Sequence, residues 1–233
     1  MNRTHTIIIG IIVLLIIGAG AYAYMQKSGG YSYTLAQGEH IADWHLQGAY
    51  TGNADLEKKA NDEITRLRGL LSNKKDAITD YTLYISIANQ YHLLGDGKDE
   101  YEYLMQALAI DSTTTGLAWE NLGVLLEQTG APKSARDAYA HAAAAQPQIV
   151  QYQAQYLDFL TNHFKDNTAE IEAAFANAQK TDQTDLTLLQ IRARWLEGTG
   201  RTTEAIAVWK NMRALSPESS ASIDAEIKRL QAL

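Results

Sequence analysis

The chain has 233 residues and a formal net charge of −7, from 20 Lys and Arg side chains against 27 Asp and Glu side chains. An acidic chain repels phosphate backbones, so nucleic acid is not an expected partner. The absence of cysteine excludes disulfides, thiol nucleophiles, cysteine metal sites and a cysteine-linked lipid anchor. Hydrophobic residues make up 46% of the chain, so it can form a packed core in one or two domains.

An uncharged stretch from Ile7 to Met25 is the first strong pattern along the chain. Its 19 residues, at about 1.5 Å per residue of helix, nearly cross a hydrocarbon core of about 30 Å. Tyr22 and Tyr24 lie near one end, where interfacial aromatic residues are typical. We therefore predict that residues 1–27 form a single-pass transmembrane anchor.

Two alternatives for this segment remain open. One is a secretory signal cleaved at the small-x-small pattern Ala21-Tyr22-Ala23, which would give a secreted protein, and the other is a buried helix of a soluble fold. The positive-inside rule, applied to Arg3 and Lys27, favours a cytoplasmic N-terminal tail by a margin of about one charge. Since anchor and signal both place the remaining chain outside the cytoplasm, we predict an extracytoplasmic location for it.

Two further segments precede the main pattern. Residues 28–40 contain a glycine pair and small polar side chains, which predicts a short flexible tether. Residues 41–75 are predicted to form a helical pair, which is a divergent repeat if Trp44 and Gly48 are the large and small residues of its first helix. Its second helix is indicated by four apolar residues on one helical face. These are Ala60, Ile64, Leu67 and Leu71.

The stretch from Trp119 to Pro147 carries the main fold signal. Large, small and turn residues recur in it at fixed intervals from Gly116. They are Trp119, Leu122, Gly123, Gly130, Ala135, Tyr139, Ala142 and Pro147. This pattern resembles the tetratricopeptide repeat (TPR), a family of 34-residue helix–turn–helix units. Small residues at these positions let two antiparallel helices approach closely, and large ones fill the space between units.

The same intervals recur on both sides of this stretch. Gly95, Gly130 and Gly200 are separated by 35 and 70 residues, so a further unit is expected between the last two. The predicted units are about 81–114, 116–149, 150–183 and 186–219. Two departures in the first unit predict looser packing between its helices, because Glu100 stands where a small residue is expected and Ser112 where proline is.

The resemblance implies an all-α fold. We expect a right-handed superhelical solenoid of antiparallel helix pairs over residues 80–217, preceded by the transmembrane helix. The third unit is degenerate, because Phe164 or Lys165 stands where the turn glycine is expected. Residues 218–233 are predicted to form an amphipathic helix that caps the array.

Candidate partner-binding residues follow from the same resemblance. In TPR proteins the first helix of each unit lines the concave face, and certain positions of that helix point inward. The residues at these positions are Thr82, Ile85, Asn89, His92, Leu117, Glu120, Val124, Glu127, Gln128, Gln190, Arg194 and Glu197.

The expected chemistry of the partner comes from these side chains. Some TPR proteins clamp the terminal carboxylate of a peptide with lysine and asparagine. Only Asn89 matches that arrangement, whereas Ile85 and Glu120 stand where lysine would be required, so such a clamp is not expected. The predicted groove is apolar and acidic, which favours a neutral or basic amphipathic protein segment.

His40, Asp43 and His45 form the only ligand-like cluster in the sequence. Imidazole and carboxylate suit zinc or another divalent cation, but two histidines five residues apart do not share a helical face well. We therefore interpret this segment as a solvated or partner-facing loop and expect no metal or cofactor. The sequence also has no glycine-rich phosphate loop, nucleophile elbow or histidine pair at i,i+4, so a metal-dependent hydrolase or other enzyme is not expected.

The function predicted from the sequence is that of a membrane-tethered TPR scaffold. It would bind protein or peptide segments and assemble or support a complex of the cell envelope, such as a bacterial one. The alternative is a structural module that self-associates into a homo-oligomer. A third form is a secreted TPR protein released by cleavage of the N-terminal signal.

Overall fold

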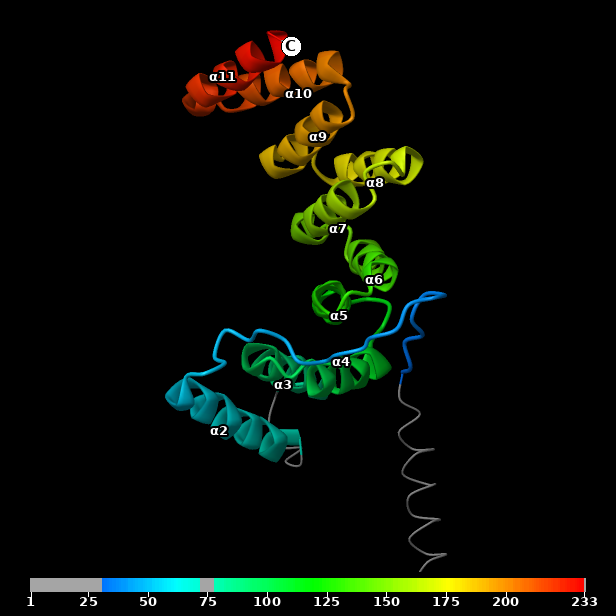
Figure 1. Cartoon of the computed structure of the whole chain (residues 1–233), viewed down its shortest axis with the longest axis vertical. Coiled ribbons are helices and arrows are strands. Elements are labelled where there is room, and N and C mark those ends of the chain that lie inside the picture. The colour runs from blue at the N-terminus through cyan, green and yellow to red at the C-terminus, as the bar shows by residue number, and fades with distance from the viewer. Residues whose placement is uncertain (1–30, 72–77, 233) are drawn as a thin grey trace, which may run out of the picture.

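The computed structural model describes residues 31–71 and 78–232. Within these ranges the regular structure is helical, and the only β-type pairing is an isolated antiparallel bridge between His45 and Asp96. The helices stack one after another along the long axis of the molecule (Figure 1). The prediction of an all-α fold is therefore confirmed for this part of the chain.

Eleven segments make up the helical array of the described residues. They are α2 (Ala54–Leu71), α3 (Asp80–Leu94), α4 (Gly97–Ile110), α5 (Leu117–Gln128), α6 (Pro132–Ala145), α7 (Val150–His163), α8 (Thr168–Thr181), α9 (Leu186–Gly198), α10 (Thr202–Leu215), the short 3-10 helix η1 (Pro217–Ser219) and α11 (Ser220–Gln231). From α3 to α10 they form four successive pairs joined by short turns, and the two members of each pair pack together.

Glycine ends the first helix in three of the four pairs. Gly95, Gly130 and Gly200 have φ angles of 79°, 78° and 75°, a region that other residues adopt at a cost. In the third pair α7 ends at Phe164 with a φ of −131°, so the turn forms without a left-handed residue. This explains why the third unit lacks the glycine that marks the others.

The small residues of the pattern lie where two helices touch. Gly123 on α5 packs against the ring of Tyr139 on α6, and a Cβ atom added to Gly123 would lie 2.6 Å from Tyr139 Cδ1. Ala135, Tyr139 and Ala142 are all buried. In the first pair, Glu100 occupies the equivalent small position and is itself buried, with His92 Nδ1 3.1 Å from its Oε2.

The segment before the helices, residues 31–53, runs along the solenoid as an extended strap. Figure 1 shows it, in blue and cyan, crossing from the side of α6 past α4 to α2. Tyr31 and Tyr33 meet the edge of Trp119 with ring centroids 5.6 and 5.8 Å away. The residues at 31–40, which we expected to be a flexible tether, are thus held against the first two helix pairs.

The helical pair expected over 41–75 is corrected by the structure, which has one helix, α2, in the described part of that range, residues 41–71. The segment expected to be the first helix is part of the extended strap. Its backbone forms hydrogen bonds with the α3–α4 turn and not the internal hydrogen bonds of a helix. Leu46 N–H donates to Gly95 O at 2.8 Å, and Gly97 N–H donates to Trp44 O at 2.9 Å. Trp44 packs on Tyr101 of α4 with ring centroids 5.2 Å apart.

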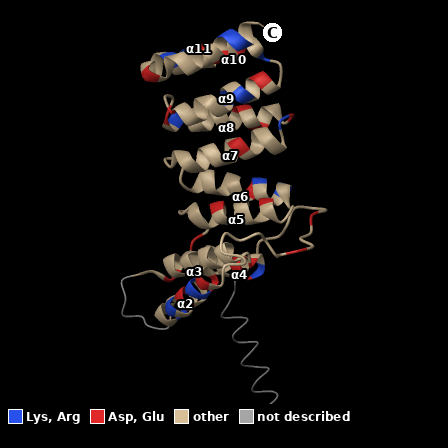
Figure 2. Ribbon diagram, turned by 60° about the vertical axis from the view of Figure 1, so that its left-hand side comes forward, with Lys and Arg blue, Asp and Glu red and all other residues tan. Residues whose placement is uncertain are grey.

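Among the described helices, α2 carries the most charged side chains, and its basic and acidic residues are interspersed (Figure 2). Lys58 and Asp62 form an i,i+4 pair at 2.5 Å, and Arg66 and Glu63 form an i,i+3 pair at 2.7 Å. The opposite face of α2 packs on α3. Such pairs are typical of a solvated outer helix.

The membrane prediction concerns residues outside this structure. The expected anchor over residues 1–27 lies outside the described ranges. Among the residues that the structure does describe, no helix combines the length and the apolar character needed to cross a bilayer.

Candidate protein-binding groove

A large hollow of the described surface lies between α7 and α9, the first helices of the third and fourth pairs. Its volume is about 640 Å³. Asp158 and Thr161 of α7 and Lys165 just beyond it form one wall, and Gln190 and Arg194 of α9 lie on the other. The lining mixes polar and apolar residues, and its charged members are Asp158, Lys165 and Arg194.

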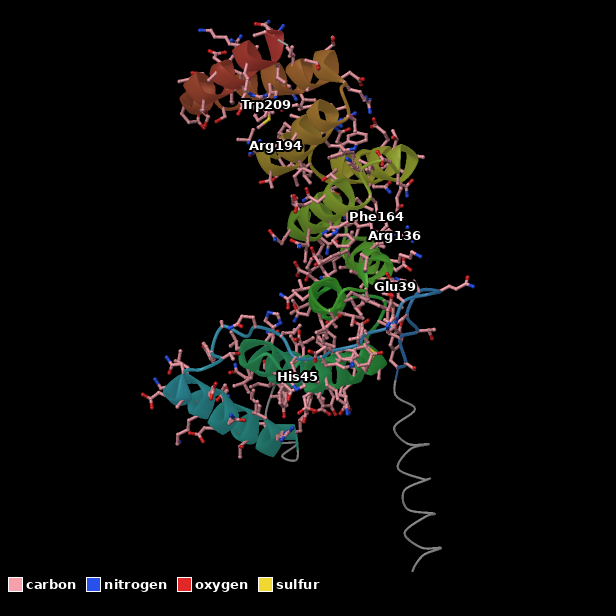
Figure 3. All side chains as sticks on the ribbon, viewed as in Figure 1. Glu39, His45, Arg136, Phe164, Arg194 and Trp209 are labelled. Atoms are coloured by element: carbon pink, nitrogen blue, oxygen red, sulfur yellow. The ribbon has the colours of Figure 1, made fainter. Side chains whose placement is uncertain are left out.

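A second hollow of about 310 Å³ adjoins the first between α9, α10 and α11. Gln190 and Arg194 line both hollows, so the two meet along α9. The second is more apolar, because Trp209, Met212 and Ile223 form its floor. We call the two together the C-terminal groove. Figure 3 shows Arg194 and Trp209 close to each other where α9 approaches α10.

Arg194 stands at the junction of the two hollows, and its charge helps to lower the pKa of Glu197. Its side chain is exposed and forms no hydrogen bond or ion pair with any residue in the described ranges. Lys165 and Asp158 are likewise exposed and unpaired by their side chains within the same part of the chain. The open charges of the groove are therefore two cations and one anion.

The carboxylates closest to this junction are already bound to arginine. Arg229 Nη1 lies 2.6 Å from Glu197 Oε1, and Arg229 Nη2 lies 2.8 Å from Glu226 Oε2. The hydrogen bond from Arg229 holds the pKa of Glu197 below its ordinary value. Arg229 thus pairs with both acids, and the charge of Arg194 also contributes to the lowered pKa of Glu197.

Trp209 lines the second hollow but is almost wholly buried. The residue is only 4% exposed, and its indole Nε1–H has no acceptor within the described residues. The other two tryptophans of the helical pairs are satisfied, since Trp119 Nε1 donates to Ser112 O at 2.9 Å and Trp195 Nε1 to Lys165 O at 3.2 Å. A buried donor without an acceptor costs about 1–3 kcal/mol. Because the Nε1 atom itself is buried, a molecule lying in the groove does not reach it.

The predicted residues of the first two units occupy a different setting. Ile85 is 4% exposed and belongs to the core. Asn89 Oδ1 accepts from Asn121 Nδ2 at 2.9 Å, and His92 bonds to Glu100. These three side chains are therefore enclosed or engaged within the protein.

The predicted acids of the second unit are also engaged. Glu127 accepts from Tyr139 OH at 2.9 Å and lies 3.0 Å from His163 Nε2. Glu120 is half-buried, and desolvation raises its pKa. The remaining predicted residues of these units are exposed or partly exposed on the first helices. They are Thr82, Leu117, Val124 and Gln128.

The structure brings two of the three predicted residues of the last unit into the C-terminal groove. Gln190 and Arg194 line it, whereas Glu197 is held by Arg229. Sequence reasoning missed Asp158 and Thr161, which lie three residues apart on one face of α7, and Lys165, which follows just beyond the end of that helix. Because that unit has no turn glycine, its position in the repeat could not be fixed from the sequence, and its inward-pointing residues could not be assigned.

The histidine cluster at the strap is a local turn. Asp43 Oδ1 accepts from the backbone N–H of His45 at 2.9 Å and lies 2.8 Å from His45 Nδ1. Both side chains are strongly exposed. In the described ranges no group of three or more His, Cys, Asp or Glu side chains is arranged to hold a metal ion.

Comparison with known proteins places the fold. No protein-family model and no curated protein matches the chain. Among solved structures, that of MamA superposes with a TM-score of 0.54 at 17% identity over 72% of this chain and 91% of that one. A second MamA structure gives a TM-score of 0.53 at 16% identity, over 72% of this chain and 94% of that one.

A third solved structure, of YrrB, carries the same fold. It is described as a TPR protein with an unusual peptide-binding site, and it superposes with a TM-score of 0.53 at 16% identity over 72% of this chain and 84% of that one. At such low sequence identity, these structural similarities support only a shared fold. The described part of the chain has the helical-pair fold of TPR proteins.

Proposed function

We propose that this protein is a membrane-tethered scaffold that binds segments of other proteins in its C-terminal groove and so assembles or supports a cell-envelope complex. The observation that carries the proposal is the junction at Arg194, where an exposed cation borders two adjoining hollows, the second of which is the more apolar. A surface of this kind offers both a charged contact and a buried apolar one to a chain lying across it.

The fold supports a binding role in place of catalysis. TPR proteins present the first helices of successive units to partners, and α7 and α9 are such helices here. The peptide-binding site named for YrrB belongs to that protein, but its shared fold makes binding of a protein segment a natural use of this one. Fold likeness alone does not assign a partner, so the argument rests on the groove.

The membrane part of the proposal rests on the sequence of residues 7–25. An uncharged apolar stretch of 19 residues is long enough to act as an anchor. Arg3 before it and Lys27 after it favour a cytoplasmic tail and a solenoid on the far side of the membrane. Fractionation of cells that express the full chain, followed by protease treatment of intact and broken cells, tests this placement. The proposal predicts a membrane-bound protein whose solenoid is cleaved only from outside the cytoplasm.

Binding in the groove is tested by affinity capture from solubilised membranes with the full chain. The variant Arg194→Glu reverses the charge at the junction. Its matched control is Lys210→Glu, because Lys210 is an exposed cation of α10 that lines neither hollow. Proteins that are captured by wild type and Lys210→Glu but lost from Arg194→Glu support the proposal. An identical captured set for all three contradicts binding in this groove.

A further inference from the structure

The large apolar side chains that stay exposed in the described residues share one edge of the array. They are Ile78 just before α3, Ile110 at the end of α4, Leu117 at the start of α5, Leu186 at the start of α9 and Leu215 at the end of α10. The two helices of a pair are antiparallel, so the start of the first and the end of the second lie at the same edge. Within the described ranges, the turns at the opposite edge hold none of these side chains. Single exposed apolar residues are ordinary, but their restriction to one edge indicates a surface with a use.

Ile110 and Leu117 are the part of this edge that belongs to the first two helix pairs, and we call these two residues the apolar edge. Ile110 is 52% exposed and Leu117 is 39% exposed. In the loop between them, Asp111 Oδ1 accepts from the backbone N–H groups of Thr113 at 2.9 Å and Thr114 at 2.8 Å. The one carboxylate next to Ile110 in the sequence is therefore hydrogen-bonded within its own loop.

The strap brings the N-terminal part of the chain to the same place. Tyr31 meets the ring of Trp119 with centroids 5.6 Å apart, and Trp119 lies in the first turn of α5, two residues after Leu117. Trp119 Nε1 donates to the O atom of Ser112, in the loop that joins Ile110 to Leu117, at 2.9 Å. The first residue of the strap thus lies next to the apolar edge.

The docked strap also shortens the connection to the apolar stretch at residues 7–25. The sequence predicts a flexible tether over residues 28–40, and a fully extended chain of that length spans about 45 Å. Because the strap is held from Tyr31 onwards, only the six steps from Met25 to Tyr31 remain, which reach at most about 20 Å. Figure 1 shows α9, α10 and α11 at the other end of the array from the first part of the strap. A bilayer entered by residues 7–25 is therefore within reach of the apolar edge.

We propose that the apolar edge rests on the surface of the bilayer that residues 7–25 enter, with Ile110 and Leu117 at the headgroup boundary. This inference rests on the membrane part of the proposed function and adds the orientation of the array to it. Aliphatic side chains are stabilised at that boundary, and Tyr31 beside them is of a residue type enriched there. Because the chain has a net charge of −7, the lipid surface that it fits is zwitterionic and not anionic.

Lipid contact at single positions tests the inference. The chain has no cysteine, so one introduced cysteine carries a fluorophore at a known place. Full-length Ile110→Cys and Leu117→Cys are labelled and reconstituted in phosphatidylcholine vesicles, with and without lipids that carry a nitroxide near the headgroup. Lys98→Cys is the matched control, because Lys98 is exposed on the same first pair but at its opposite edge.

The expected result is a difference between the two edges. Labels at positions 110 and 117 should lose about half of their emission or more to the nitroxide, because side chains at the headgroup boundary lie within about 10 Å of it. The label at position 98 should keep its emission. Labels at 110 and 117 that are quenched no more than the label at 98 would overturn the inference.

A second substitution separates lipid contact from an effect of the label. Leu117→Glu, added to labelled Ile110→Cys, places a charge at an exposed position, where the fold tolerates it and the headgroup boundary does not. Quenching at position 110 should fall about twofold or more, whereas Lys98→Glu in the same background should leave it unchanged. Circular dichroism of the labelled chains should be the same with and without either substitution. Equal quenching in both variants would contradict lipid contact at this edge.

Flotation of the vesicles distinguishes this inference from the proposal beneath it. A full chain that does not float with the vesicles, or that alkaline washing releases, would overturn the anchor and the inference together. A chain that floats and survives the wash, but whose labels at 110 and 117 escape the nitroxide, would overturn the inference and leave the anchor and the C-terminal groove standing. Labels whose emission shifts to the blue without quenching by the nitroxide would assign the edge to a second copy of the chain in place of lipid.

Discussion

Glu39 of the strap caps helix α6 by binding Ser134, a residue 95 positions further along the chain. Glu39 Oε2 accepts from the backbone N–H of Ser134 at 2.9 Å and from its hydroxyl at 2.7 Å, while Oε1 accepts from Lys133 N–H at 2.7 Å. Helix α6 begins after Ala131, which offers no side-chain cap of its own. The carboxylate of Glu39, distant in the sequence, therefore caps the N-terminus of α6, where a serine or aspartate next to the helix usually does so. Figure 3 shows Glu39 beside the green helix α6.

The first prediction concerns this cap. Glu39→Ala should lower the free energy of unfolding by about 0.5–2 kcal/mol, because the first N–H groups of α6 lose their acceptor. Thermal unfolding followed by circular dichroism measures it. Glu102→Gln on α4 is the control, since Glu102 is exposed and bonds to no residue that the structure describes. Equal stability of Glu39→Ala and wild type would refute the cap.

The contribution of Glu39 should also depend on pH. Burial raises the pKa of Glu39, but the hydrogen bonds from Ser134 and Lys133 outweigh it and leave the pKa below its ordinary value of 4.5. A depressed pKa means that the stabilisation is present above pH 4.5 and is lost as pH falls through the folded pKa. The difference between wild type and Glu39→Gln should therefore shrink in acid.

The second prediction concerns the strap as a whole. Tyr33→Ala removes the ring that meets Trp119 and the hydroxyl that donates to Ser134 O at 2.9 Å. We expect a loss of at least about 1 kcal/mol and faster protease cleavage between residues 31 and 46. Limited proteolysis with mass spectrometry checks this. Thr34→Ala, at a neighbouring exposed position, should leave the cleavage pattern unchanged.

The third prediction compares two glycines. Gly123→Ala should destabilise the protein by about 1–3 kcal/mol, because the new methyl group would press on the Tyr139 ring, 2.6 Å from its Cδ1 atom. Gly198→Ala is the matched control, since a Cβ there meets nothing within 4 Å and Gly198 lies in the last turn of α9. It should stabilise the protein by up to about 1 kcal/mol. The reverse order in chemical denaturation would contradict the packing of α5 on α6.

The fourth prediction concerns the buried pair in the first unit. The hydrogen bond to Glu100 raises the pKa of His92 above 6.5, and burial raises that of Glu100 above 4.5. Because both folded-state values are raised, each contribution to stability is complete below the ordinary pKa and is lost as pH rises through the folded one. The contribution of this pair to the melting temperature should therefore fall as pH increases from the acid side through neutrality.

Replacing both members of this pair isolates the effect. The double variant Glu100→Gln with His92→Gln should have a flatter dependence of melting temperature on pH. His40→Gln is the control, because His40 is exposed and has no hydrogen bond to the described residues. An unchanged slope in the double variant would show that other groups determine the pH response.

The helix pairs could be predicted from the sequence because their signals are local. The glycines at 95, 130 and 200 and the small residues packed against large ones repeat at fixed intervals, and each acts within one pair. The strap could not be predicted in this way. Its extended backbone has no helical period, and its main partner, Ser134, lies far away in the sequence.

Only part of the C-terminal groove could be predicted from the sequence, for a similar reason. Gln190 and Arg194 followed from the repeat register, but the pairing of Glu197 with Arg229 depends on how α11 folds back over α9. From the sequence we expected Glu197 to be available to a partner, but in the structure it forms an ion pair with Arg229. Trp209 is buried, and only three-dimensional packing reveals that its N–H lacks an acceptor among the described residues.

The central claim is that partners bind in the C-terminal groove, and site-specific photo-crosslinking in living cells tests it most directly. A photoreactive residue replaces Gln190, which lines both hollows, and in a second strain it replaces Lys210, which lines neither. The account predicts a discrete crosslinked protein from position 190 that disappears when Arg194→Glu is added, and none from position 210. Crosslinks of equal strength from both positions, or from position 190 regardless of Arg194→Glu, would contradict it.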